Sequence, residues 1–373
     1  MRTAPRRAVV ALFVLPTIAY GAAPIPRASS YLLLDAASGE VLASRGATVR
    51  RPMASTTKMM TALLTIESGD LDRPITVPAT ATSVGESTAG LVAGERIALG
   101  DLLTGLLVGS GNDAATAIAT GLGPGQLAFV ARMNRRATAL GLRDTHFANP
   151  HGLDAPNHYS SVRDLVTLAT ALMAHPRART IVANRRATIP GPNGNGRRNL
   201  VSENTLLSID READGVKTGH TAGAGYAMVA HARRPRTATA LYLALIGEPS
   251  LDARAEDAKR LLRWGFAQYG RPTVIRANVA VARAAIRDRP GVFVDLGVLH
   301  PLSATVRIGR PLSAVVVALP EVRGPVTRGQ QFGVVELRSG ERTVARAPLA
   351  ALSDAAGPDL ADRADAAIGH LVP

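Results

Sequence analysis

Ser55 and Lys58 stand three residues apart near the start of an apolar segment, residues 53–66, that is predicted to be a buried helix. Side chains at this spacing lie on one face of a helix, about one turn apart. A serine hydroxyl is a weak nucleophile until a base takes its proton, and a desolvated lysine near other cations can be neutral and act as that base. Taken alone, the spacing also fits a capped helix with a surface lysine.

Lysine is rare in this chain, which makes Lys58 informative. Among the 43 Lys+Arg residues only Lys58, Lys217 and Lys259 are lysines. Arginine cannot give up its proton in a protein, whereas a buried lysine can. A chain that carries nearly all of its positive charge on arginine is expected to keep lysine where a proton has to leave. Lys259 belongs to no motif, and we interpret it as a solvated helix residue.

Ser110 and Asn112 lie in a predicted loop between two helical segments, residues 102–107 and 114–119. A serine in such a loop can pass a proton between a base and a leaving group. The Asn112 amide can hold a peptide carbonyl and donate toward the lysine. Serine, glycine and asparagine are also common turn residues, so an ordinary helix-linking turn is the alternative interpretation.

Lys217, Thr218 and Gly219 come shortly before a strand-like apolar run, residues 226–232. On an edge strand beside the serine they would present a cation, a hydroxyl and an unobstructed backbone. The sets Ser-x-x-Lys, Ser-x-Asn and Lys-Thr-Gly, in this order, are typical of penicillin-binding proteins and serine β-lactamases. Together they are far more specific than any one of them.

At these residues the chain resembles the low-molecular-mass penicillin-binding proteins, which are serine D-alanyl-D-alanine carboxypeptidases. The resemblance extends beyond the short motifs to residues 54–61, 110–114, 149–154 and 214–221. It implies an α/β (α+β) transpeptidase/β-lactamase-like catalytic domain, residues 28–270, followed by a small all-β domain, residues 274–352.

The resemblance also implies a reaction. Ser55 would attack the carbonyl between two terminal D-alanines, with Lys58 as the base. Ser110 would relay the proton to the departing D-alanine, and water would then hydrolyse the acyl-enzyme. No cofactor or metal is implied, and the eight histidines show no metal-ligand spacing in a chain without cysteine.

Substrate binding is implied for the remaining motif residues. Asn112 would hold the substrate amide, and Lys217 and Thr218 would bind the terminal carboxylate beside Gly219. Backbone N–H groups of Ser55 and His220 would form the oxyanion hole, so the imidazole of His220 is not expected to take part. The implied substrate is a peptidoglycan stem peptide that ends in D-Ala-D-Ala, and β-lactam antibiotics are the implied covalent inhibitors.

Three alternatives share the motifs. A β-lactamase of class A needs a glutamate that positions the deacylating water. Between the second and third motifs the only glutamates are Glu203 and Glu212, and neither stands in a Glu-x-x-Leu-Asn context. A D,D-endopeptidase acting on cross-links is the second alternative. A non-catalytic cell-wall binding protein is the third, and the intact serine and lysines argue against it.

Some residues depart from the family pattern or invite a second interpretation. Some relatives carry an arginine just before an Asn-Gly-Leu-Leu segment, where this chain has Glu203, so that role is not carried over. His151 and Asp154 are expected to be structural, because their loop precedes a capped helix. The spacer between the first two motifs is short, so the lid around residues 83–91 is expected to differ.

The ends of the chain predict where the protein works. Residues 1–23 have the basic start, apolar run and small residues of a secretory signal peptide. We therefore expect export to the periplasm. Residues 353–373 predict a short amphipathic helix with an acidic polar face, which anionic lipid would repel. We therefore expect at most weak peripheral contact with the inner membrane, helped by the basic remainder of the protein. A frayed terminus without a role is the alternative.

Composition sets the frame for these elements. The chain has 373 residues, 46% of them hydrophobic, and this length and apolar fraction are enough for two packed domains. The net charge is +14. The arginine-rich segment 177–198 lacks interleaved aromatic residues, so nucleic acid is not expected as a partner. It is interpreted as a solvated hairpin rim that attracts the anionic cell-wall polymer or lipid surface.

Periodicity then places the elements. Expected in the first domain are a hairpin at 31–35 and 41–44, a helix at 129–140, a capped helix from Ser161 to Met173, a hairpin within 184–200, strands at 226–232 and 237–246, and a helix at 253–269. After Gly270 the pattern changes to short strand-like runs at 274–281, 292–296, 305–308, 313–319, 331–337 and 343–347.

Overall fold

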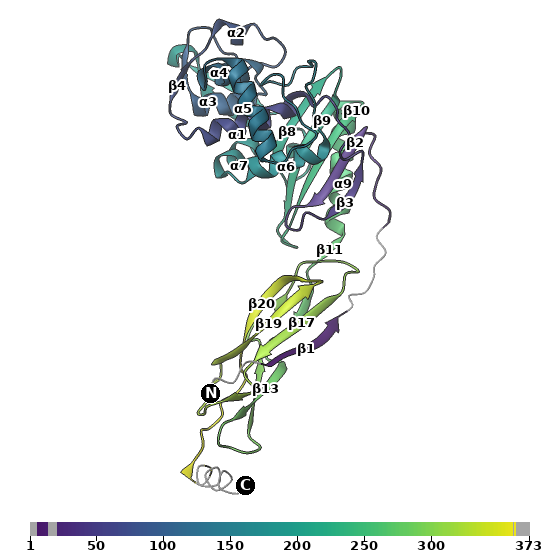
Figure 1. The fold of residues 1–373 in the computed structure, drawn as a ribbon, viewed down its shortest axis with the longest axis vertical. Helices are drawn as coiled ribbons and strands as arrows, with labels where there is room; N and C mark the ends of the chain where they lie inside the picture. The colour runs from purple at the N-terminus through teal and green to yellow at the C-terminus, as the bar shows by residue number, and fades with distance from the viewer. Residues whose placement is uncertain (1–5, 14–20, 361, 363–373) are drawn as a thin grey trace. The chain divides into compact units, whose positions relative to one another are not determined.

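The computed structural model describes residues 6–13, 21–360 and 362, and the chain divides into two compact units. The first unit is residues 22–266, and the second contains the chain from Ala267 onward together with the N-terminal segment up to Gly21 (Figure 1). The first is mixed α and β, and the second is built on β-strands, with helical residues only at Ala267, Leu360 and Asp362 among those described. This is the fold class that the sequence predicts.

A five-stranded antiparallel sheet forms the centre of the first unit. Its order is β3-β2-β10-β9-β8, which makes β8 an edge strand. The strands are β2 (Ser30–Asp35), β3 (Val41–Arg45), β8 (Ala213–Thr221), β9 (Gly225–Arg234) and β10 (Thr239–Glu248). The Lys217 motif therefore lies on an edge strand, as expected.

Helices cover both faces of this sheet. On one face Ala244 and Ile246 of β10 join the core that the helices from α1 to α7 share. On the other face Leu241 lies against α9, where a Cβ atom added to Gly265 would come within 2.9 Å of the Leu241 side chain. Burial on both faces explains why β10 is continuously apolar rather than alternating.

Most helices of the first unit lie in the chain between β3 and β8, and α9 follows β10 (Figure 1). They are a 3₁₀ turn η1 (Ala54–Thr57), α1 (Lys58–Glu67), α2 (Ala79–Thr82), α3 (Leu99–Leu107), α4 (Asn112–Gly121), α5 (Gln126–Ala139), α6 (Val162–Met173), α7 (Pro176–Val182), α8 (Leu206–Ile209) and α9 (Leu251–Ala267). Two small hairpins pair β4 (Pro74–Thr76) with β5 (Arg96–Ala98), and β6 (Arg186–Pro190) with β7 (Arg197–Val201), with a 3₁₀ turn η2 (Pro192–Gly194) between the latter two.

The start of α6 shows how local sequence sets an element boundary. The Ser161 hydroxyl accepts a hydrogen bond from the Asp164 main-chain N–H at 3.2 Å, as the capping pattern predicts. The carboxylate of Asp164 accepts instead from the Asp144 N–H and the Thr145 hydroxyl. This side chain thus joins the cap to the preceding loop.

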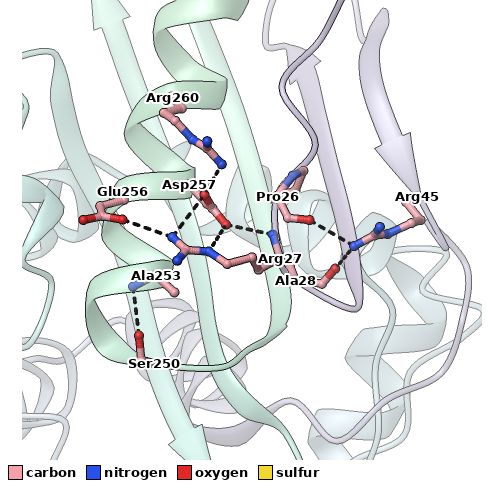
Figure 2. Close-up of polar contacts among 9 residues, drawn as sticks. All are labelled: Pro26, Arg27, Ala28, Arg45, Ser250, Ala253, Glu256, Asp257 and Arg260. Carbon is pink, nitrogen blue, oxygen red and sulfur yellow. Dashed lines mark hydrogen bonds and ion pairs between the residues drawn. The ribbon is translucent and has the colours of Figure 1, made fainter.

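The chain that enters the first unit is fastened to α9 by a charged cluster (Figure 2). The fully buried carboxylate of Asp257 accepts from the main-chain N–H of Arg27 at 2.8 Å and from its guanidinium at 3.2 Å. Glu256 pairs with Arg27 at 3.0 Å, and Arg260 also pairs with Asp257. On the opposite side of this segment Arg45 donates to the carbonyls of Pro26 and Ala28.

The second unit is built on a seven-stranded sheet with the order β1-β17-β19-β20-β14-β13-β18. Its strands are β1 (Arg6–Phe13), β13 (Ala280–Ile286), β14 (Phe293–Gly297), β17 (Leu312–Ala318), β18 (Glu321–Val322), β19 (Gln331–Ser339) and β20 (Arg342–Ala351). The unit also contains two short strand pairs, β11 (Tyr269–Gly270) with β16 (Val306–Arg307) and β12 (Thr273–Ile275) with β15 (Leu302–Ser303). Inward-facing Val, Leu, Ile and Ala residues form its separate core.

Two expected elements differ in the structure. The run 274–281 is not one strand, because β12 and β13 belong to different sheets and Asn278 between them has a φ of +58°. The predicted helix 53–66 begins as the 3₁₀ turn η1 and becomes α-helical only at Lys58. A positive φ of 50° at Ala54 accompanies this tight start.

The ends of the chain leave the targeting predictions open. Arg6–Phe13 pairs as the edge strand β1 with β17 in this structure, and cleavage of residues 1–23 stays a prediction. Most of the predicted amphipathic tail lies outside the described residues. Within the described part of the chain, no single helix has both the length and the apolar character to cross a membrane. Among the described helices, only α4 and α5 taken together, with a bend of 93° between them, have the length and composition of a membrane-spanning segment.

Candidate active site

The first motif lies at the junction of η1 and α1. Lys58 Nζ is 2.7 Å from Ser55 Oγ, so the predicted pair is in direct contact. The sequence placed both residues on an α-helix, whereas Ser55 stands in the 3₁₀ turn. In a 3₁₀ turn residues i and i+3 eclipse each other, which aligns the two side chains more directly than an α-helix would.

Lys58 is fully buried among oxygen atoms. Besides the Ser55 hydroxyl, its Nζ contacts Asn112 Oδ1 at 2.7 Å and the carbonyl oxygen of His151 at 2.6 Å. Burial, and then the positive charge of Lys217, lower the pKa of Lys58 well below its usual range. An ammonium would donate to all three oxygens, whereas a neutral amine would keep its two N–H groups for the two acceptor-only oxygens and present its lone pair to the serine hydroxyl.

The second and third motifs also meet. Lys217 Nζ donates to Ser110 Oγ at 2.9 Å and to the carbonyl of Thr218 at 2.8 Å. Ser110 has a φ of +56°, in the left-handed region that costs a non-glycine residue energy and that concentrates at functional sites. Burial, with the positive charge of Arg254, lowers the pKa of Lys217 to about 8 against the opposing effect of Glu203.

Asn112 corrects one expectation. From the sequence we expect its amide to donate toward the lysine, but Asn112 Oδ1 accepts from Lys58. Its Nδ2 instead donates to the carbonyl of Gly85 at 3.0 Å, and its main-chain N–H donates to the carbonyl of Ser87 at 2.8 Å. Asn112 therefore ties the base to the loop at residues 85–91.

Asp113 holds the rest of that loop. Sequence reasoning did not identify it as a functional residue. Its carboxylate accepts from the Thr88 hydroxyl at 2.6 Å and from the main-chain N–H groups of Ala89 and Leu91. The signal was present, since Asp113 belongs to the matching stretch 110–114. The role of its side chain depends on partners 22 to 25 residues earlier in the chain, which local spacing does not indicate.

Gly219 brings the edge strand against the nucleophile. A Cβ atom at this position would lie 2.5 Å from the main-chain nitrogen of Ser55, so only glycine permits this approach. Thr218 before it is buried, and His220 after it is exposed with its ring stacked on Tyr226 at a centroid distance of 4.1 Å.

The loop at residues 149–154 supports the nucleophile from the other side. His151 contributes its carbonyl to Lys58, while burial lowers the pKa of its imidazole to about 4 and leaves it neutral. Asn149 Oδ1 accepts from the N–H of Gly152 at 2.6 Å. Gly152 has a φ of +103°, and a Cβ there would lie 2.1 Å from the carbonyl oxygen of Ala54. The loop therefore contacts the reactive pair through its main chain, and the structural role expected of its side chains stays a prediction.

Arg254 is a buried cation that no motif revealed. It is 1% exposed, donates to the carbonyl of Glu203 at 3.0 Å, and lies over the ring of Tyr226. It belongs to no motif and is one of several basic residues of α9, so spacing gives no signal for it. Among the described residues no cluster of His, Cys, Asp or Glu could hold a metal ion.

Comparison with known proteins places this geometry in context. The family described as D-alanyl-D-alanine carboxypeptidase (peptidase S11) matches residues 20–246. The chain is 32% identical over 342 residues to the D-alanyl-D-alanine carboxypeptidase DacA of Escherichia coli, covering 88% of this chain and 83% of that protein.

Solved structures of similar proteins share the fold of this chain. Penicillin binding protein 5 from Haemophilus influenzae aligns with a TM-score of 0.65 at 28% identity, covering 90% of this chain and 99% of that one. A Streptomyces DD-transpeptidase aligns with a TM-score of 0.63 at 31% identity, covering 66% of this chain and 100% of that one.

Proposed function

Because the chain belongs to the D-alanyl-D-alanine carboxypeptidase family of serine peptidases, we propose that Ser55 is its nucleophile and Lys58 its base. The enzyme hydrolyses the bond between two terminal D-alanines. The observation that carries the residue assignment is the buried contact of 2.7 Å between Ser55 Oγ and Lys58 Nζ.

Acylation begins with neutral Lys58. Its two N–H groups point to Asn112 Oδ1 and the His151 carbonyl, so the lone pair is directed at the Ser55 hydroxyl. As Ser55 Oγ bonds to the substrate carbonyl carbon, its proton passes to Lys58 and the carbonyl electrons move onto the oxygen. The main-chain N–H groups of Ser55 and His220 are the proposed donors to that oxyanion, and one such donor is worth about 10²–10³ in rate.

The leaving D-alanine needs a proton. We assign its delivery to Ser110, whose hydroxyl accepts from Lys217 and can pass a proton from Lys58 to the departing nitrogen. The C–N bond breaks, D-alanine leaves, and an ester to Ser55 remains. Water then attacks this ester, its proton returns through Lys58 to Ser55, and the shortened peptide is released.

Substrate binding is assigned to the edge strand. Lys217 is the buried cation available to a terminal carboxylate, with the Thr218 hydroxyl beside it. Asn112 is the proposed partner of the substrate amide. The proposed substrate is the stem peptide of peptidoglycan, and a β-lactam would acylate Ser55 in the same way.

Location is a proposal that rests on the ends of the chain. The pattern of residues 1–23 supports export to the periplasm. The acidic polar face expected of residues 353–373 opposes contact with an anionic membrane surface, whereas the basic balance of the rest of the chain attracts it, so the proposed peripheral contact is weak.

A steady-state assay tests the proposed function. We expect release of free D-alanine from a pentapeptide that ends in D-Ala-D-Ala, loss of that release in Ser55→Ala, and no loss in Ser208→Ala, which alters an exposed serine of α8. A cross-linked dimer in parallel measures endopeptidase action. Full activity of Ser55→Ala would overturn the assignment.

A further inference from the structure

We propose that Asp154 is a positioning residue for acylation, which fixes the end of the edge strand β8 against Ser55 by clamping the turn between β8 and β9. The proposal rests on the proposed function and adds a residue that belongs to none of the three motifs. Asp154 itself touches neither Ser55 nor Lys58 through its carboxylate, so its effect on the reaction is indirect.

Both carboxylate oxygens of Asp154 hold the turn. Oδ1 accepts from the Thr221 hydroxyl at 2.8 Å, and Oδ2 accepts from the main-chain N–H of Gly223 at 2.9 Å. Thr221 Oγ1 in turn accepts from the N–H of Ala224 at 3.1 Å. A Cβ atom at Gly223 would lie 2.8 Å from Asp154 Oδ2, so the carboxylate is packed directly onto the backbone of the turn.

The clamped turn directly follows the catalytic part of β8. This strand ends at Thr221, two residues after Gly219, whose Cα lies against the Ser55 backbone. As an edge strand it has a hydrogen-bonded neighbour on one side only, β9. The open side is where the site has to admit substrate. The position of His220, the proposed second oxyanion donor, therefore depends on support from beyond the sheet, and Asp154 supplies it.

The loop that carries Asp154 also supports the nucleophile and its base. His151 accepts from Lys58, and Gly152 packs on the Ala54 carbonyl just before Ser55. One short loop thus contacts the base, the nucleophile and, through Asp154, the oxyanion strand. A displacement of about 1 Å between such groups can cost about 10²-fold in rate, which makes their common support consequential.

The rate constant of acylation by a chromogenic cephalosporin tests this role. In Asp154→Ala we expect it to fall about tenfold or more, while the dissociation constant of the initial complex changes less than about threefold. Asp154→Asn keeps an acceptor for the Thr221 hydroxyl and should recover part of the rate. It also serves as the test variant if Asp154→Ala does not fold.

A double-mutant cycle with Thr221→Val separates positioning from general loosening. If the clamp acts as a unit, the double variant with Asp154→Ala acylates no more slowly than Asp154→Ala alone, because the shared contact is lost once. Additive losses of rate would contradict the clamp.

Asp35 provides the matched control. Its carboxylate also accepts from one hydroxyl and from main-chain N–H groups, those of Ser38 and Ala37, but in the β2–β3 turn. Asp35→Ala should lower the melting temperature and leave the acylation rate within about twofold of the parent.

The outcomes distinguish the two proposals. A parent protein that is not acylated at Ser55 would refute the proposed function. A parent that is acylated, with Asp154→Ala within about twofold of it or no slower than Asp35→Ala, would overturn the positioning role alone.

Discussion

Lys58 owes its chemistry to where it lies. Full burial lowers its pKa first, and the neighbouring Lys217 lowers it further. Its oxygen contacts satisfy two N–H groups and leave one lone pair for Ser55. A permanent cation at this position could fill the same space and contact the same oxygens but could not take a proton.

Replacement of Lys58 by arginine tests this reasoning. We expect Lys58→Arg to be nearly as damaging as Lys58→Ala, with acylation at least about a hundredfold slower than in the parent, which is about 2.7 kcal/mol of barrier. Lys259→Arg, in α9 and outside every motif, is the control and should acylate normally. Acylation of Lys58→Arg within about tenfold of the parent would overturn the base role.

At the scale of elements, loops and one hairpin position the motif residues. The loop at 85–91 is held by hydrogen bonds to Asn112 and Asp113. Glu95, just after this loop, forms an ion pair with β7. Arg198 of β7 donates to Glu95 at 2.7 Å, and the two side chains are 11% and 1% exposed. Arg198 also donates to the carbonyl of Pro190, so the pair fixes the β6–β7 hairpin as well.

Removal of one partner from this pair should be costly. We expect Glu95→Ala to lower the free energy of unfolding by about 3 kcal/mol, because it leaves the buried Arg198 cation unpaired. The pair Glu67–Arg136, with side chains 28% and 33% exposed, is the control, and Glu67→Ala should cost about 1 kcal/mol or less. Urea unfolding followed by the fluorescence of Trp264, the single tryptophan, measures both. Equal losses would contradict the expected effect of burial.

Many of the helices and strands, and the grouping of the motifs, could be predicted from sequence for physical reasons. The hairpins and the buried α1 follow from periodicity, and the meeting of the three motifs follows from residue types that the chemistry requires at fixed spacing. The 3₁₀ start of α1 could not be predicted, because Ala54 needs a positive φ that tertiary packing imposes. Asp154 and Arg254 act through contacts with residues distant in sequence, which no local spacing encodes.

At the scale of the whole molecule, two units with separate cores share one chain. The catalytic unit carries two buried acids, Glu248 and Asp257, and Asp257 binds Arg27 of the entry segment (Figure 2). Burial and the negative charge of Asp257 raise the pKa of Glu248 to about 7. For Asp257 burial acts in the opposite direction to its hydrogen bonds with Arg27, which lower its pKa. Glu248 is thus the member that holds a proton.

The contribution of Glu248 to the stability of the catalytic unit should therefore decrease as pH rises from about 4.5 to about 7, against the buried neutral His151, whose contribution increases over the lower part of this range. In this window folded Glu248 retains a proton that the unfolded chain releases, so folding is favoured most at the acid end. Replacement by a neutral amide removes the dependence. We expect the stability advantage of Glu248→Gln over the parent to be about 2 kcal/mol larger at pH 8 than at pH 5.

Trp264 fluorescence is a suitable probe, since this residue lies on the same helix as Asp257. Glu256→Gln, at a neighbouring exposed acid that also pairs with Arg27, is the control and should show no such difference between the two pH values. A Glu248→Gln variant with the same advantage at both pH values would show that Glu248 is already charged at pH 5.

The central claim is that Ser55, activated by Lys58, forms the acyl-enzyme. Its most direct test is mass spectrometry of the protein after reaction with a penicillin, with the modified peptide sequenced. We predict one penicilloyl group on Ser55, no adduct on Ser55→Ala, and only slow labelling of Lys58→Arg. An adduct of the same yield on Ser55→Ala, or one located on Ser110, would contradict the account.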